Sequence, residues 1–268
     1  MIWIATAAGA LAARGESQPG EVFVSAVQGG AEYSTDHHSW NRLEPGLILG
    51  PGAELRTSFN ATADLVLKHC GTALRLLPKS HLTLTRLEET FTGEEIITRT
   101  RLDLRSGGIV GSQRKLSRTS TFDISTPTAT ATIRGTEYVV RADGAVSCLE
   151  GAVSVKYITS GHGPPLTVNV PSGFSFDPAT GQVVTTTPAY LHNLIAHVNA
   201  VRNNARVFKV GKARVVVKPE GKISPIGGDD DGDHGHHGGD DDDDGGHGHG
   251  HGNDHRDALA HAFLLPSP

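Results

Sequence analysis

The sequence predicts an all-β protein, a jelly-roll-like sandwich or short β-helical roll, with one late amphipathic helix and a disordered C-terminal tail. Three observations support this prediction. Gly and Pro are plentiful, at 33 and 14 residues, and Thr and Val dominate many segments, which favours strands and tight turns. Apolar and polar residues alternate with a period of two, most clearly at residues 120–140. After Pro225 the composition turns almost entirely to Gly, Asp and His, from which no core can form.

Turn signals separate the first predicted strands. Residues 22–27 are strand-like and end before a Gly pair. Pro-Gly occurs at positions 45–46 and 51–52, and each pair predicts a turn because Pro presets φ and Gly tolerates a positive φ. Residues 63–68 and 73–76 flank a Cys-Gly turn and are typical of a hairpin.

The next predicted strands carry the clearest alternation. Residues 122–125 and 128–133 each place apolar side chains on one face and Thr, Ser or Asp on the other. This pattern predicts one buried and one solvated face. We expect a turn at Gly135-Thr136 and a hairpin over residues 146–155, centred on Glu150-Gly151.

One helix is predicted late in the chain. Thr187 is a suitable N-cap, and Pro188 suits the first helical position. An apolar stripe then recurs at three- and four-residue spacing: Leu191, Leu194, Ile195, Val198 and Val201. We therefore expect a helix over residues 188–203 that covers an open end or side of the β core, followed by a basic strand pair over residues 207–217.

The N-terminus is typical of an export signal. Residues 1–13 are apolar, and Ala10-Leu11-Ala12 fits a small-x-small cleavage pattern, although no positively charged segment precedes it. The stretch is too short to span a bilayer, and no other segment reaches the length of a span. We expect an exported protein, periplasmic or at the cell surface.

Charge is distributed unevenly along the chain. The formal net charge is −5, but residues 227–257 carry 11 acidic and 1 basic side chain, whereas the rest carries 18 acidic and 23 basic. The mildly basic body has no Lys/Arg cluster with interleaved aromatic residues, so nucleic acid is not an expected partner. The two cysteines, Cys70 and Cys148, have no zinc-ligand spacing, and free thiols are favoured over a disulfide between them.

The acidic tail has definite chemistry. Imidazole suits zinc, nickel and copper, and carboxylates suit calcium and magnesium. A flexible chain loses entropy when it wraps an ion, so we expect loose binding of zinc, nickel or calcium and no required cofactor. A solvated polyanionic spacer is the alternative interpretation. The candidate metal ligands are His234, His236, His237, Asp240, Asp241, Asp242, His247, His249, His251 and His255.

Several segments, in order, resemble one family. Residues 122–127 (Phe-Asp-Ile-Ser-Thr-Pro), the alternating run that follows, Arg134-Gly135-Thr136 and residues 149–155 (Leu-Glu-Gly-Ala-Val-Ser-Val) resemble the FecR domain, and weaker similarity covers about residues 22–156. The resemblance implies a compact extracytoplasmic β domain of the kind that relays transporter occupancy to a sigma factor. The sequence shows no anti-sigma segment and no preceding transmembrane helix, so we expect a standalone module whose partner is an unknown protein or envelope component.

The chain divides into four predicted parts. Residues 1–20 are a signal peptide or export remnant, and residues 21–160 are the FecR-like β domain. Residues 161–226 are a β extension that contains the helix, and residues 227–268 are the Gly/Asp/His-rich tail.

Three functions are compatible with the sequence. We favour a non-enzymatic binding, sensing or envelope-scaffold module, because no nucleophile elbow or other catalytic motif is present. Arg134-Gly135-Thr136 could contact a ligand, although a purely structural turn is favoured. A metal-buffering protein that uses the tail is the first alternative. A glycan-active enzyme on a jelly-roll fold is the last, and would need convergent carboxylates or histidines in the body.

Overall fold

The computed structural model describes residues 16–92, 95–158, 164–210, 213–217 and 223–225. All of these residues belong to one compact unit, Met1–Gly228. The predicted metal ligands of the tail, and most of the predicted export segment, lie outside the described residues.

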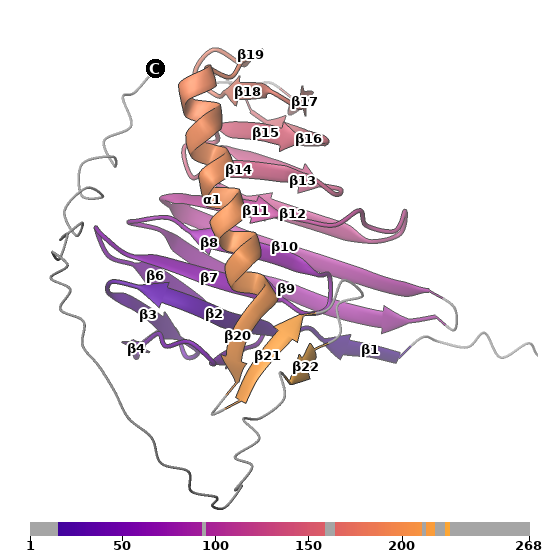
Figure 1. The fold of residues 1–268 in the computed structure, drawn as a ribbon. Helices are drawn as coiled ribbons and strands as arrows, with labels where there is room; N and C mark the ends of the chain where they lie inside the picture. Colours follow the sequence, from indigo (N-terminus) through magenta and orange to yellow (C-terminus); the bar gives the residue numbers. More distant parts are fainter. Residues whose placement is uncertain (1–15, 93–94, 159–163, 211–212, 218–222, 226–268) are drawn as a thin grey trace, which may run out of the picture. The chain divides into compact units, whose positions relative to one another are not determined.

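Two long sheets, which we call sheet A and sheet B, make up most of the described chain (Figure 1). Sheet A has the order β17 (Leu166–Pro171), β16 (Ala152–Tyr157), β13 (Ala129–Ile133), β12 (Thr121–Ser125), β10 (Ile96–Ser106), β9 (His81–Phe91), β6 (Glu54–Thr57), β3 (Ala31–Ser34) and β4 (Asn41–Arg42), and β1 (Glu16–Pro19) pairs with β9. Sheet B has the order β19 (Gln182–Thr185), β18 (Phe174–Asp177), β15 (Val146–Glu150), β14 (Glu137–Arg141), β11 (Gly108–Ser112), β8 (Thr72–Leu76), β7 (Thr62–Leu67), β2 (Val22–Gln28) and β5 (Ile48–Leu49).

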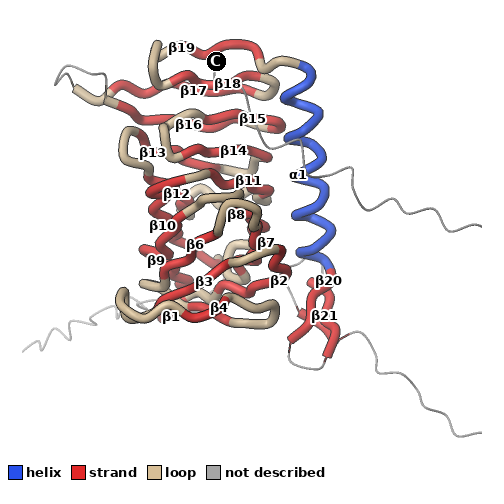
Figure 2. Tube along the Cα trace, turned by 90° about the vertical axis from the view of Figure 1, so that its left-hand side faces the viewer, coloured by secondary structure: helices blue, strands red, loops and turns tan. Residues whose placement is uncertain are grey.

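The chain winds back and forth between the two sheets. From β6 onward it contributes one or two strands to one sheet and then crosses to the other, so each crossing adds strands to a growing stack (Figure 2). Strand β10 pairs in parallel with β12 because β11 lies in the opposite sheet between them. The all-β prediction of a sandwich or roll with one late helix is confirmed.

The hairpin predicted over residues 146–155 is wrong. Strand β15 pairs with β14 and β18 in sheet B, whereas β16 pairs with β13 and β17 in sheet A. Gly151, with φ of 85°, therefore turns the chain from one sheet to the other and does not close a hairpin. In the sequence, two strands joined by a short turn with a Gly look the same whether the turn closes a hairpin or crosses to the other sheet. The hairpin predicted at residues 63–76 is present as β7 and β8.

The main core fills the space between the inner faces of the sheets. Phe122 and Ile124 enter it from sheet A, and Tyr138 and Val140 enter it from sheet B, all at 0% exposure. Each large apolar side chain buried in this way contributes about 1.5–3 kcal/mol relative to its exposed state. The strict alternation of these residues with polar ones thus determines which face of each strand points inward.

Helix α1 (Pro188–Arg206) crosses the outer face of sheet B (Figure 2). Its residues Leu194 and Val198 pack against Val110 and Val139 of that sheet in a second, smaller core. The helix ends three residues later than the 188–203 predicted, because Asn203 and Asn204 do not interrupt it. No helix among the described residues is long and apolar enough to cross a membrane.

A small third sheet follows the helix. It consists of β20 (Val207–Val210), β21 (Ala213–Val217) and β22 (Ile223–Pro225) in antiparallel order. The strand pair predicted over residues 207–217 is therefore present, with a third strand added.

Candidate ligand groove

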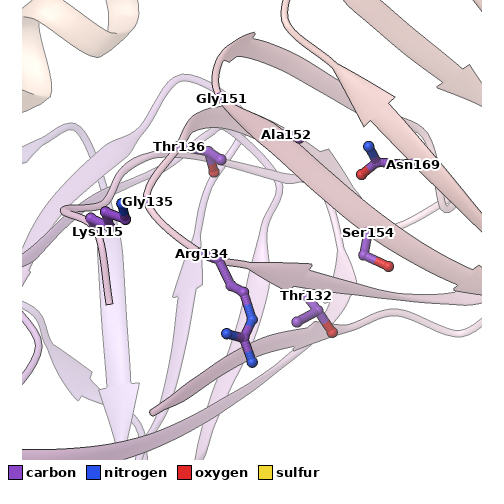
Figure 3. Close-up of a pocket in the computed structure, with 9 residues that line it drawn as sticks. All are labelled: Lys115, Thr132, Arg134, Gly135, Thr136, Gly151, Ala152, Ser154 and Asn169. Atoms are coloured by element: carbon purple, nitrogen blue, oxygen red, sulfur yellow. The ribbon is translucent and has the colours of Figure 1, made fainter. Parts of the chain in front are cut away.

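An open groove of about 670 Å³ lies at one end of strands β13 and β16 of sheet A. Figure 3 shows its residues, which come from the outer face of the sheet and from three chain segments that cross beside it. No carboxylate, histidine or thiol is among the residues that line it. The lining consists of Lys115, Thr132, Arg134, Gly135, Thr136, Gly151, Ala152, Ser154 and Asn169.

Two glycines bring the crossing segments close together. Gly135 has φ of 99°, and a Cβ on it would lie 2.6 Å from the Lys115 Cα, so only Gly fits there without displacing the backbone. Gly151 lies against the same turn, where a Cβ would lie 2.9 Å from the Gly135 carbonyl oxygen. The backbone N–H of Gln113 donates a hydrogen bond of 3.0 Å to the backbone carbonyl of Thr136. The segments that contain Lys115, Gly135 and Gly151 therefore pack directly against one another and form a corner beside the groove.

A row of polar side chains forms the sheet side of the groove. Thr132 pairs in register with Ser154, and Ser154 pairs with Asn169, so the three occupy the same level on neighbouring strands. Alternation places them on the outer face, because Ile133, Val153 and Val170 beside them are fully buried. The Thr132 hydroxyl donates to Asp123 at 2.7 Å, which continues the row into β12.

Two cations flank this row without an ionic partner. Lys115 and Arg134 are both exposed, and neither forms a salt bridge or a side-chain hydrogen bond within the described chain. The nearby carboxylate of Asp123 is 3.8 Å from the Arg101 guanidinium and already accepts from Thr132. The groove can therefore offer charged donors to an anion.

The sequence indicated some of these residues and missed others. The Arg134-Gly135-Thr136 motif lies at the centre of the groove, where Gly135 and the buried Thr136 are structural and Arg134 faces solvent. Lys115 and Asn169 were missed, because neither lies in a recognisable motif and only the strand register brings them to the site. Glu137 and Glu150, which pair across β14 and β15, do not line the groove, and Glu137 accepts a hydrogen bond of 2.8 Å from Arg202.

Both cysteines are free thiols. Cys70 lies in the turn between β7 and β8, and Cys148 lies in β15. Burial raises the pKa of each thiol to about 11, which makes the thiolate, the reactive form, scarce at neutral pH. A catalytic or redox role is therefore not favoured for either residue.

A second polar cluster lies at the other end of sheet A. The Glu54 carboxylate accepts from His37 at 3.1 Å and from His81 at 3.4 Å. Burial raises the pKa of Glu54, but the two histidine contacts outweigh burial and the net pKa lies below the usual range. Among the residues that the structure describes, no group of three or more His, Cys, Asp or Glu side chains is arranged to hold a metal ion.

The fold and the groove together define an all-β, two-sheet module with an open, basic, hydroxyl-rich surface. Residues 53–154 match the family model described as FecR protein. The resemblance to the FecR domain that the sequence indicated is therefore confirmed for this segment. Every groove residue except Asn169 lies in the matched segment, which also contains the corner formed by Gly135 and Gly151.

The comparison with solved structures found two crystal structures of a candidate anti-sigma factor from Parabacteroides distasonis ATCC 8503. At 1.65 Å resolution the match has 16% sequence identity and a TM-score of 0.38 over 50% of this chain and 59% of that chain. At 2.50 Å the identity is 15% and the TM-score 0.37, with the same coverage. This chain thus spans 59% of the length of either structure. No curated protein matches the chain.

Proposed function

We propose that this protein is a non-enzymatic, extracytoplasmic binding or sensing module that receives its ligand in the groove around Arg134. The observation that carries this proposal is the pair of unpartnered cations, Lys115 and Arg134, on a corner built from the FecR segment. A buried or paired Arg would serve the fold alone, whereas an exposed and unpaired one is available to a ligand. The apolar N-terminal segment supports export to the envelope.

The lining of the groove favours binding over catalysis. General acid–base chemistry needs a carboxylate, histidine or similar group at the reacting atoms, and the lining has none. The glycan-active enzyme considered from the sequence would need such groups to converge.

A site-specific cross-link tests the proposal in the full chain. A photo-reactive amino acid is placed at Ser154 in the groove, and in a second variant at Ile195, which is 44% exposed on helix α1. We expect an adduct from position 154 that disappears when Arg134→Gln is added, and no such adduct from position 195. An adduct that persists with Arg134→Gln, or equal adducts from both positions, would reject the groove as the binding site. Fractionation of the same cells tests export.

We also propose a second function, metal binding by the tail, because His247, His249 and His251 alternate with Gly in the sequence. Calorimetric titration of Zn²⁺, Ni²⁺ and Ca²⁺ into the full chain, and into a chain with the seven candidate histidine ligands changed to Gln, tests it. Heat that depends on the histidines supports metal handling. Equal heats, or none, leave the tail as a polyanionic spacer.

A further inference from the structure

We propose that the ligand of the Arg134 groove is an acidic polysaccharide, a polymer of hydroxylated repeating units with carboxylate or phosphate groups. This proposal rests on the proposed function and names the class of ligand for the same site. Its evidence is the surface that continues beyond the groove, on the outer face of strands β12, β13, β16 and β17 (Figure 2).

The outer face of these four strands is open and hydrophilic. Helix α1 lies on sheet B, and no described element covers this face of sheet A. Two rows of polar residues run across the strands in register. One row is Asp123, Thr132, Ser154 and Asn169, and the next is Ser125, Thr130, Lys156 and Thr167. The remaining outward positions that extend these strands toward the groove are Thr121, Arg134, Ala152 and Pro171.

The rows match a polymer better than a single small anion. Neighbouring strands lie about 4.8 Å apart, so each row presents a hydrogen-bonding group at this interval across the sheet. An extended polysaccharide has a repeat of similar length and can therefore place one hydroxylated unit over each strand in turn. The groove is open to solvent, so a long polymer can lie in it and continue beyond it.

The charge on this surface selects an acidic ligand. Lys115, Arg134 and Lys156 are exposed cations, whereas Asp123, the carboxylate of the two rows, is occupied by Arg101 and Thr132. Thr136 also lines the groove, but it is only 3% exposed and its hydroxyl is buried, so the exposed cations, and not this hydroxyl, are available to the ligand.

The side chains on this face disfavour other polyanions and apolar ligands. None of the outward residues of the two rows is aromatic, so bases of a single-stranded nucleic acid would find no stacking platform. None is a large aliphatic residue either, so an acyl chain or an apolar helix would gain little from burial here.

Titration of polygalacturonate into the full-length protein, followed by calorimetry at low salt, tests the ligand class. We expect saturable binding that weakens as salt is added, and no binding of dextran, which has hydroxyls but no charge. Polyaspartate, which has the charge but no hydroxyl-rich repeat, should bind more weakly. Equal binding of polyaspartate, or binding of dextran, would overturn the proposal. A phosphate-bearing polysaccharide that alone binds would keep the class and assign phosphate as its anion.

Variants locate the binding. We expect Arg134→Gln and Lys115→Gln each to weaken polygalacturonate binding by about tenfold, since each removes a charge-assisted hydrogen bond. Asn169→Asp should weaken it similarly through repulsion. Arg42→Gln is the control, because Arg42 is an exposed cation in β4 at the other end of sheet A. Unchanged thermal unfolding shows that each variant is folded, and equal loss in the control would overturn the assignment of the site.

The two proposals can fail separately. If the cross-link from position 154 depends on Arg134 but no acidic polysaccharide binds, the ligand class is wrong and the binding function stands. If neither is observed, both proposals are wrong.

Discussion

A Cβ on Gly135 would lie 2.6 Å from the Cα of Lys115, closer than side chains approach a backbone in folded proteins. Position 135 also has φ of 99°, which disfavours any residue other than Gly. The Arg-Gly-Thr motif is thus explained by a steric contact with a segment about twenty positions earlier in the chain. The same contact holds Lys115 beside Arg134.

Gly135→Ala should therefore destabilise the protein by more than its backbone angle alone accounts for. The matched control is Gly173→Ala, since Gly173 has φ of 81° but no heavy atom within 4 Å of an added Cβ. A left-handed residue other than Gly costs about 1–2 kcal/mol in both variants. We expect a further loss of about 1–3 kcal/mol in Gly135→Ala from overpacking, measured by chemical denaturation. Equal losses would show that the contact with Lys115 is easily relieved.

The sequence predicted the strands better than their connections. The alternation in residues 122–125 and 128–133 identified two strands and their buried faces, because burial imposes a period of two. It did not show that Gly135 and Gly151 turn the chain between sheets, since a positive φ serves a hairpin and a crossing equally. It also could not place Lys115 beside Arg134, because that depends on which strands pair.

The Asp64–Arg75 ion pair should contribute far more to stability than a surface pair. Arg75 donates to both carboxylate oxygens, at 2.7 and 2.8 Å, and the two side chains are only 13% and 3% exposed. Asn204 of helix α1 also donates to Asp64. Asp64→Ala leaves the guanidinium unpaired and should cost about 3–5 kcal/mol.

The control for this pair is Glu32→Ala. Glu32 accepts from Arg56 at 2.6 Å, but both side chains are nearly half exposed, so its loss should cost about 0–1 kcal/mol. Denaturation of both variants, and a double-mutant cycle for Asp64 and Arg75, measure the difference. A loss for Asp64→Ala as small as that for Glu32→Ala would mean that water replaces the buried partner.

Helix α1 should be held against sheet B by a single row of apolar side chains. Leu194 is 4% exposed against sheet B, whereas Ile195, the next residue, is 44% exposed. Leu194→Ala should cost about 2–4 kcal/mol because it leaves a cavity, and Ile195→Ala should cost less than about 1 kcal/mol. Thermal unfolding of the two variants checks this. The sequence pattern alone assigned both residues to the apolar stripe, and a comparable loss in both variants would restore that interpretation.

His69 should make the protein lose stability in mild acid. The residue is 8% exposed, its Nε2 lies 2.8 Å from the Thr100 hydroxyl, and burial lowers its pKa from 6.5 to about 4. Because the folded state disfavours the proton, the unfolded state binds more protons between these two values. The contribution of neutral His69 is therefore fully present above about pH 6.5 and is lost as the pH falls toward 4, by about 3 kcal/mol in total.

Replacement of His69 by an amide that does not titrate separates this effect from general acid sensitivity. His69→Gln keeps a polar group near Thr100 and should lower stability at pH 7 while flattening the fall between pH 6.5 and 4. His192→Gln, at an exposed position of helix α1, should leave the pH profile unchanged. Free energies of unfolding from denaturant titrations at several pH values provide the measurement. An unaltered slope in His69→Gln would mean that His69 accepts a proton as readily in the folded state as in the unfolded chain. We do not expect this, because the side chain is deeply buried and its neighbour, the Thr100 hydroxyl, has no charge that would stabilise an imidazolium.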